Sequence, residues 1–197
     1  ADLIARMLAK KLGETWGVSV VVDNRPGASG ITGTDLVAKA APDGHTLGTV
    51  IITHATNPAL HAKLPFDAIT DFTPVGLLTK NAQLLVVNAS MPVKSVAELI
   101  AVARASKEEL IFASGGNGTP SHLAGELLKS TAKINLLHIA YKGSAPAILD
   151  LLSDRVAINF SSLPALLAFV KSGRLTALSI TGLTRSPLLP QVPTIAE

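Results

Sequence analysis

Hydrophobic residues in the second half of the chain alternate between the spacing of a strand and the spacing of a helix. Short apolar runs, suited to the two-residue period of a strand, are followed by stripes that repeat every three or four residues. The pattern predicts strands at 84–88, 109–113, 135–139, 156–160 and 175–180, and helices at 95–105, 120–130, 144–152 and 163–172. Strands that alternate with helices predict a parallel sheet covered on both faces, which places the chain in the α/β class.

The first half follows the same logic less regularly. An amphipathic helix is expected from residue 2, strands at 17–23 and 46–52, and a glycine-rich connection at 24–34 between them. The pattern breaks at Lys80-Asn81, before the regular alternation starts. We therefore predict two α/β lobes, one formed by 1–82 with a return at 184–197 and the other by 83–183.

A glycine-rich loop lies between a predicted strand and a predicted helix at 114–121. Thr119 suits the N-cap and Pro120 the first helical position, so the loop ends at a helix N-terminus, which favours an anion. A phosphate-binding P-loop requires Gly-Lys-Ser/Thr, and Gly118-Thr119-Pro120 does not supply it. Backbone amides and neutral side chains suit a carboxylate, and the candidates are Ser114, Gly115, Gly116, Asn117, Thr119 and Ser121. Alternatively, the glycines only form a tight turn.

Polar residues also follow other predicted strands. In α/β proteins, ligands bind where parallel strands end, so these residues are expected to line the same site. The candidates are Thr53, His54, Asn57, Tyr141, Gly143, Ser144 and Ser161. A histidine beside a proline, as at 54, is also typical of an ordinary loop.

No catalytic motif and no metal-ligand spacing is recognisable. A dinucleotide fingerprint is also absent, because the glycines at 27, 30 and 33 do not have the Gly-x-Gly-x-x-Gly spacing. We therefore expect no catalytic residue, no cofactor and no metal. A binding protein is favoured; the alternative is an α/β enzyme acting on a phosphorylated or carboxylated metabolite.

Composition excludes several further classes. The net charge is +3, and the chain has one Trp, one Tyr and five Phe, without the basic cluster and stacking rings of a nucleic-acid interface. It has no cysteine, which excludes disulfides and thiolate chemistry. No apolar run reaches the roughly 18 to 20 residues that cross a bilayer.

Several motifs together resemble the periplasmic solute receptors of tripartite tricarboxylate transporters, the Bug/TctC-type family. They are, in chain order, DNRPGA (23–28), AAPDG (40–44), NPAL (57–60), KLPFD (63–67), DFTPV (71–75), PSHLAGEL (120–127), YKG (141–143) and PQVPTIAE (190–197). The resemblance implies a two-lobed periplasmic binding protein of type II-like architecture. It would hold a small di- or tricarboxylate, amino acid or aromatic acid between the lobes and deliver it to membrane permease subunits, as a monomer.

The resemblance also implies how the ligand is held and where this chain departs from the family. Family receptors grip the carboxylate through backbone amides, hydroxyls and ordered water, without an arginine clamp. They have a first strand and a loop before the helix that begins here at residue 2, and further helices after the PTIAE motif. We therefore expect lobe 1 to lack these parts in this chain, with a signal peptide removed or outside it.

Overall fold

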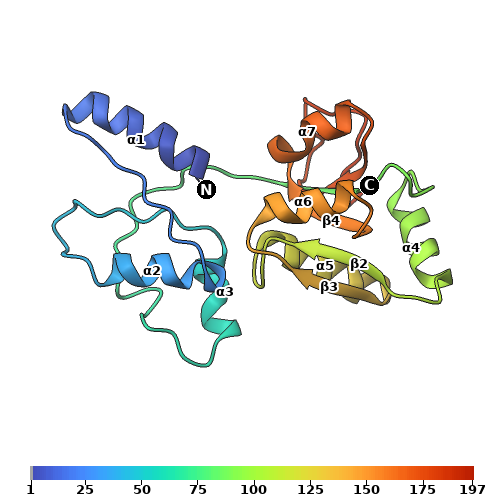
Figure 1. The fold of residues 1–197 in the computed structure, drawn as a ribbon, viewed down its shortest axis with the longest axis horizontal. Coiled ribbons are helices and arrows are strands. Elements are labelled where there is room, and N and C mark those ends of the chain that lie inside the picture. The colour runs from blue at the N-terminus through green and yellow to red at the C-terminus, as the bar shows by residue number, and fades with distance from the viewer. Residues whose placement is uncertain (1) are drawn as a thin grey trace. The chain divides into compact units, whose positions relative to one another are not determined.

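A computed structural model describes residues 2–197, and it divides at Thr79 into two compact units, the second being Lys80–Glu197 (Figure 1). Each unit is considered by itself. None of the helices within 2–197 is both long enough and apolar enough to cross a membrane.

The second unit is built on one five-stranded sheet (Figure 1). Its strand order is β3-β2-β4-β1-β5. The strands are β1 (Gln83–Asn88), β2 (Leu110–Ser114), β3 (Leu136–Ala140), β4 (Ile158–Ser162) and β5 (Leu175–Ile180). These bounds confirm all five strands predicted for this half of the chain to within two residues at each end.

The sheet is mixed, so the expectation of a purely parallel sheet is wrong. Strand β2 pairs in parallel with β3 and β4, but β1 runs antiparallel to both β4 and β5. The register places Gln83 at the start of β1 opposite Ser162 at the end of β4. The chain therefore enters the sheet at the edge where β2, β3 and β4 end, and β1 has to run the opposite way.

Four helices cover both faces of this sheet, as predicted. They are α4 (Val96–Ala105), α5 (Pro120–Ala132), α6 (Ser144–Leu152) and α7 (Leu163–Lys171). One apolar cluster packs α6 and α7 on one face, and a second packs α4 and α5 on the other. A capping box forms at the N-terminus of α4, because Ser95 accepts from the Glu98 N–H and Glu98 accepts from the Lys94 N–H.

The C-terminal segment packs on the second unit. Leu189 and Val192 are buried in the α6/α7 cluster, and Thr194 forms a bridge with Ile180 at the end of β5. Residues 184–197 therefore belong to the second unit in this structure, whereas the sequence-based division placed them in the first lobe. Burial of two apolar side chains and the backbone bond from Ile180 N–H to Pro193 hold the segment there.

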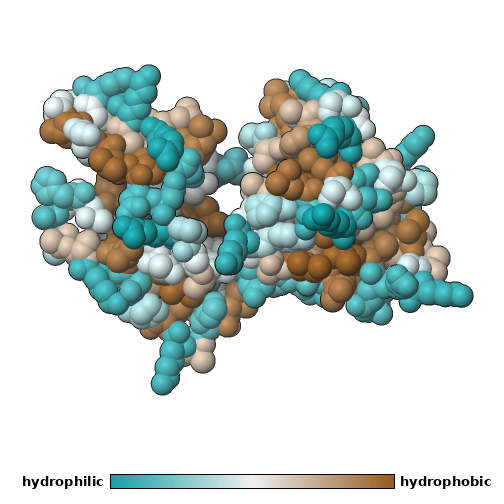
Figure 2. Space-filling view, viewed as in Figure 1, coloured by the Kyte–Doolittle hydropathy of each residue, from teal (hydrophilic) through white to brown (hydrophobic). Residues whose placement is uncertain are grey.

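The first unit contains helices but, among its described residues, no strand. The helices are α1 (Asp2–Trp16), the 3₁₀ turn η1 (Ala28–Gly30), α2 (Ile31–Ala38) and α3 (Thr53–Leu60). The predicted strands at 17–23 and 46–52 are wrong for this structure. Their apolar side chains are open to solvent, with Val21 82% exposed, and apolar surface is visible over this unit in Figure 2. A strand needs a neighbour for its backbone groups, and the unit provides none to these segments.

Asn88 links the end of β1 to α6 and yields a first prediction. Its side-chain amide donates to the Leu151 carbonyl (2.7 Å) and its oxygen accepts from the Ser90 N–H (2.9 Å). Asn88→Ala is expected to lower the free energy of unfolding by about 2 kcal/mol, measured by urea denaturation, because a buried carbonyl loses its donor. Asn88→Asp keeps the acceptor but loses that donor, so wild-type stability in the Asp variant would contradict this assignment.

Candidate ligand-binding site

Three parallel strands of the second unit end at one edge of the sheet, and each leads into the N-terminus of a helix. Strand β2 leads to α5, β3 to α6 and β4 to α7. Parallel strands end on the same side, so the three helix N-termini face this edge, as the sequence predicts. Each N-terminus carries free backbone N–H groups and the positive end of the helix dipole.

The loop between β2 and α5 is held by bonds within itself. The amides of its glycines donate to nearby side chains: Gly115 to Ser121 Oγ, Gly116 to Ser114 Oγ and Gly118 to His122 Nδ1, each at 3.1 Å. Gly116 (φ 130°) and Gly118 (φ 72°) have backbone conformations that glycine adopts without strain. All three amides, including those of the candidates Gly115 and Gly116, therefore have partners inside the loop.

The loop hydroxyls are also turned inward. Thr119 caps α5 as predicted, accepting from the His122 N–H, and its hydroxyl donates to the Gly116 carbonyl (2.6 Å). Its oxygen also lies 3.0 Å from Ser121 Oγ. The side chains of Ser114, Thr119 and Ser121 are buried, whereas Asn117 is exposed. The hydroxyls thus form the frame of the loop, and contact between them and a ligand remains a prediction.

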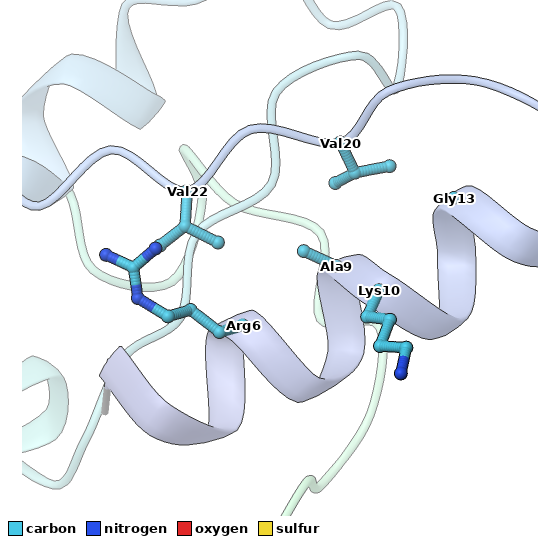
Figure 3. Close-up of a pocket in the computed structure, with 6 residues that line it drawn as sticks. All are labelled: Arg6, Ala9, Lys10, Gly13, Val20 and Val22. Carbon is cyan, nitrogen blue, oxygen red and sulfur yellow. The ribbon is translucent and has the colours of Figure 1, made fainter.

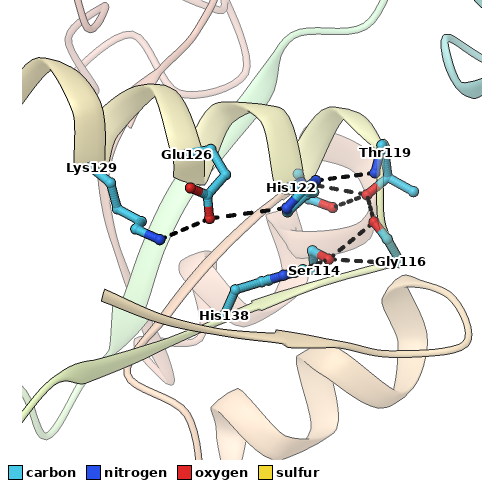
Figure 4. Close-up of polar contacts among 9 residues, drawn as sticks. Ser114, Gly116, Thr119, His122, Glu126, Lys129 and His138 are labelled. Atoms are coloured by element: carbon cyan, nitrogen blue, oxygen red, sulfur yellow. Dashed lines mark hydrogen bonds and ion pairs between the residues drawn. The ribbon is translucent and has the colours of Figure 1, made fainter. Parts of the chain in front are cut away.

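Two histidines that sequence reasoning did not select complete this frame (Figure 4). His138 on β3 places Nε2 2.7 Å from Ser114 Oγ, and its ring lies 4.3 Å from the ring of His122 on α5. The pairing of β2 with β3 places His138 opposite Phe112, two residues before Ser114, and the strand positions predicted from the sequence did not specify this pairing.

The surroundings of His138 disfavour its charged form. Burial, helped by the charges of His122 and Lys129 and partly opposed by Glu126, lowers the pKa of His138 from an ordinary 6.5 to about 4. Folded protein therefore binds fewer protons at this ring than unfolded protein between about pH 6.5 and 4. Its contribution to stability is complete above pH 6.5 and is lost as pH falls through this range.

The second loop at this edge, between β3 and α6, lies against the first. The Gly143 N–H donates to the Gly115 carbonyl (3.1 Å), and a Cβ added at Gly115 would lie 3.3 Å from the Ser144 nitrogen. Gly143 occupies the N-cap of α6 and provides no side-chain bond. The N-terminus of α6 is therefore without a side-chain cap directly beside Gly115.

Tyr141 is tied to α6. Its hydroxyl donates to Asp150 (2.7 Å), which raises the pKa of Tyr141 because the bond favours the neutral phenol. Its ring packs against the α6/α7 cluster. The phenol thus has a structural partner, and ligand contact by Tyr141 remains a prediction.

At the end of β4, Ser162 is the N-cap residue of α7 and makes no side-chain cap bond. Ser161 before it is buried. Together with α6, this gives two helix N-termini without side-chain caps at the edge where the glycine-rich loop lies. Such ends can bind an anionic group with backbone N–H groups alone.

The candidates of the first unit lie on α3 rather than at the end of a strand. His54 donates from Nε2 to the Ala68 carbonyl (2.8 Å) and packs edge-on against Phe72, which is a packing role. Thr53 and Asn57 are buried, and Asn57 donates to the Ser29 carbonyl (3.4 Å). Contact of these three residues with a ligand remains a prediction.

A cavity of about 360 Å³ lies elsewhere in the first unit, between α1 and the segment that follows it (Figure 3). It is lined by Arg6, Ala9, Lys10, Gly13, Val20 and Val22. None of the predicted ligand residues lines it.

The profile of one protein family, described as "Tripartite tricarboxylate transporter family receptor", matches residues 4–197. The chain belongs to this family. This confirms the resemblance drawn from the sequence motifs.

Individual relatives agree with the family assignment. The chain is 41% identical over 196 residues to the "UPF0065 protein in tcbD-tcbE intergenic region" of Pseudomonas sp. (strain P51), covering 100% of this chain and 58% of that protein. Among solved structures, "R. palustris Rpa4515 with adipate" matches with a TM-score of 0.92 and 40% identity, covering 99% of this chain and 66% of that one. The "periplasmic binding protein BugD" matches with a TM-score of 0.90 and 34% identity, covering 98% and 64%.

These matches confirm the α/β fold of a periplasmic binding protein. They also show that the chain spans about 58 to 66% of the length of these proteins. Parts of the relatives thus have no counterpart in this chain, as the sequence motifs predicted.

Proposed function

We propose that this protein is an extracytoplasmic solute-binding receptor whose second unit holds one carboxylate group of a small organic acid. The acid is a di- or tricarboxylate, an amino acid or an aromatic acid. The carboxylate lies over the open N-termini of α6 and α7, beside the loop 114–119. The receptor delivers the acid to permease subunits of a tripartite tricarboxylate transporter.

The observation that carries this proposal is the pair of helix N-termini without side-chain caps at one sheet edge. A carboxylate there accepts from backbone N–H groups and neutralises the positive ends of the helix dipoles. Hydrogen bonds to a charged group contribute roughly 1.5–3 kcal/mol each, so three or four such bonds support micromolar affinity without a basic side chain. The adipate named with a related structure is an acid of this class.

The receptor role is favoured over the alternative of an α/β enzyme. The family is described as a receptor family, and BugD as a periplasmic binding protein. The polar groups around the glycine-rich loop bind one another, and Ser114, which pairs with the half-buried His138, is itself fully buried. A hydroxyl shielded in this way is a frame rather than a nucleophile. The description of BugD as a periplasmic binding protein supports a periplasmic location for this receptor as well.

Calorimetric titration with adipate tests the proposal. We expect a dissociation constant on the order of micromolar at neutral pH and no heat of binding for 1,6-hexanediol, which has the same chain length without charge. Mass spectrometry of gently purified protein should reveal a co-purified organic acid. Absence of binding across a panel of mono-, di- and tricarboxylates, together with absence of any retained acid, would contradict the receptor role.

A further inference from the structure

The glycine-rich loop is held by two imidazole rings whose centres lie 4.3 Å apart, those of His122 and His138. His122 accepts the Gly118 N–H at Nδ1 (3.1 Å). His138 lies 2.7 Å from the Ser114 hydroxyl, which in turn accepts the Gly116 N–H (3.1 Å). Both glycines with positive φ in this loop are thus bonded, directly or through one serine, to a histidine ring (Figure 4).

We propose that His122 and His138 are positioning residues of the ligand site, and that the loop keeps its binding geometry only while His122 is neutral. This inference rests on the receptor function proposed above, and it adds a pH dependence to that site.

The hydrogen bond accepted by His122 explains why a lower pH would loosen the loop. A neutral imidazole has one acceptor nitrogen, and here Nδ1 accepts while Nε2 carries the proton. A second proton would have to sit on Nδ1, facing the Gly118 N–H donor. Two donors repel, so protonation releases Gly118 from the ring and frees the loop to move.

His138 acts differently, through charge. Its bond to Ser114 survives protonation, since Nε2–H can donate to Ser114 Oγ while the hydroxyl turns to the Gly116 carbonyl, 3.2 Å away. A charge on His138, however, lies 4.3 Å from the His122 ring and against the buried ring of Phe112, on which it stacks at 4.6 Å. The two rings therefore resist being charged together.

The charged groups that face this pair all come from α5. Glu126 lies 4.0 Å from His122 Nε2 and favours a charge there. Lys129 is bonded to Glu126 at 3.0 Å and weakens that effect. On the opposite side, the neighbouring strand β2 contributes Phe112 and the Ser114 hydroxyl, neither of which offers a negative charge.

The test uses variants that keep or remove each bond. His122→Asn places an amide oxygen close to the Nδ1 position and cannot be protonated in this range, whereas His122→Ala removes the acceptor. For the second ring, His138→Gln keeps a partner for Ser114, and His138→Phe keeps the stacking on Phe112 but loses the bond.

The first readout needs no ligand. The amide resonances of Gly116 and Gly118 are followed by NMR in wild-type protein from about pH 8 to about pH 5, the range in which histidine side chains can change charge in proteins. We expect the Gly118 amide to shift and exchange faster as the pH falls in wild type and to stay unchanged in His122→Asn. The inference is overturned if the Gly118 amide resonance does not change with pH in wild type, or if it changes equally in wild type and His122→Asn.

The second readout is the affinity for adipate. The ratio of the wild-type to the His122→Asn dissociation constant cancels the protonation of adipate itself. We expect this ratio to be near one at pH 8 and to rise about tenfold by pH 5, with His122→Ala weak throughout and His138→Gln binding better than His138→Phe. A constant ratio overturns the inference. Failure of adipate to bind at pH 8 speaks against the proposed function, and the ligand-free readout still decides the role of the histidines.

Discussion

Replacing Gly125 with alanine is expected to lower the free energy of unfolding by about 2 kcal/mol, although the same change at an open helix position stabilises by up to about 1 kcal/mol. Gly125 lies within α5, where the helix crosses the sheet. A Cβ there would lie 2.2 Å from Cε2 of Phe112, far inside van der Waals contact. Phe112 is fully buried on β2 and stacked under His138, so it cannot move aside without disturbing the loop frame.

Urea denaturation of the single and double variants measures this clash. Phe112→Leu by itself costs stability through the cavity that it leaves. In the double variant Phe112→Leu/Gly125→Ala, the smaller side chain admits the new methyl group, so the two losses should be clearly less than additive. Full additivity, or a stabilised Gly125→Ala variant, would show that α5 does not press on β2 at this point.

Replacing Gly115 with valine is expected to weaken adipate binding roughly 100-fold, the equivalent of one or two hydrogen bonds to a charged group. A Cβ at Gly115 would lie 3.3 Å from the Ser144 nitrogen and 3.4 Å from the Gly143 carbonyl carbon. The valine methyl groups extend beyond that point and cover the N-terminus of α6. They would exclude the carboxylate from the amides proposed to hold it.

Gly115 is a better position for this test than Gly116, because Gly116 has a φ of 130° and any side chain there strains the backbone regardless of a ligand. The matched control is Gly76→Val in the first unit, where an added Cβ meets nothing within 4 Å, and this variant should bind adipate as wild type does. Gly115→Ala should give an intermediate loss. Calorimetry that shows wild-type affinity in Gly115→Val would mean that the α6 N-terminus is not the carboxylate site.

Features encoded by neighbouring residues were predictable. The strand and helix positions of the second unit followed from apolar periodicity, and the N-terminus of α5 followed from Thr119, whose side chain bonds to the amide three residues later. The glycine-rich loop and its two partner loops were placed at one edge because parallel strands end together. These inferences need only interactions within a few residues, or the handedness common to α/β folds.

The remaining features depend on residues far apart in the chain. The direction of β1 is decided by the edge at which the chain enters the sheet. Residues 17–23 and 46–52 do not form strands, because the described residues of the first unit contain no neighbouring strand with which they could pair. The apolar sequence alone therefore predicted strands that the structure lacks. Residues 184–197 pack with the second unit because Leu189 and Val192 find buried positions there.

The candidate site likewise has features that the sequence predicted and features that only the tertiary structure decided. By itself, the sequence determined that glycines, hydroxyls and helix N-termini gather at one edge of the sheet, because these residue types directly follow the strand ends. Only the tertiary structure decided which donors remain open. The side chains of Ser114, Ser121 and His122 accept hydrogen bonds from the loop amides, and His138 on β3 is hydrogen-bonded to Ser114. A hydrogen bond depends on distance and direction in space, and the local pattern of residues specifies neither across separate strands.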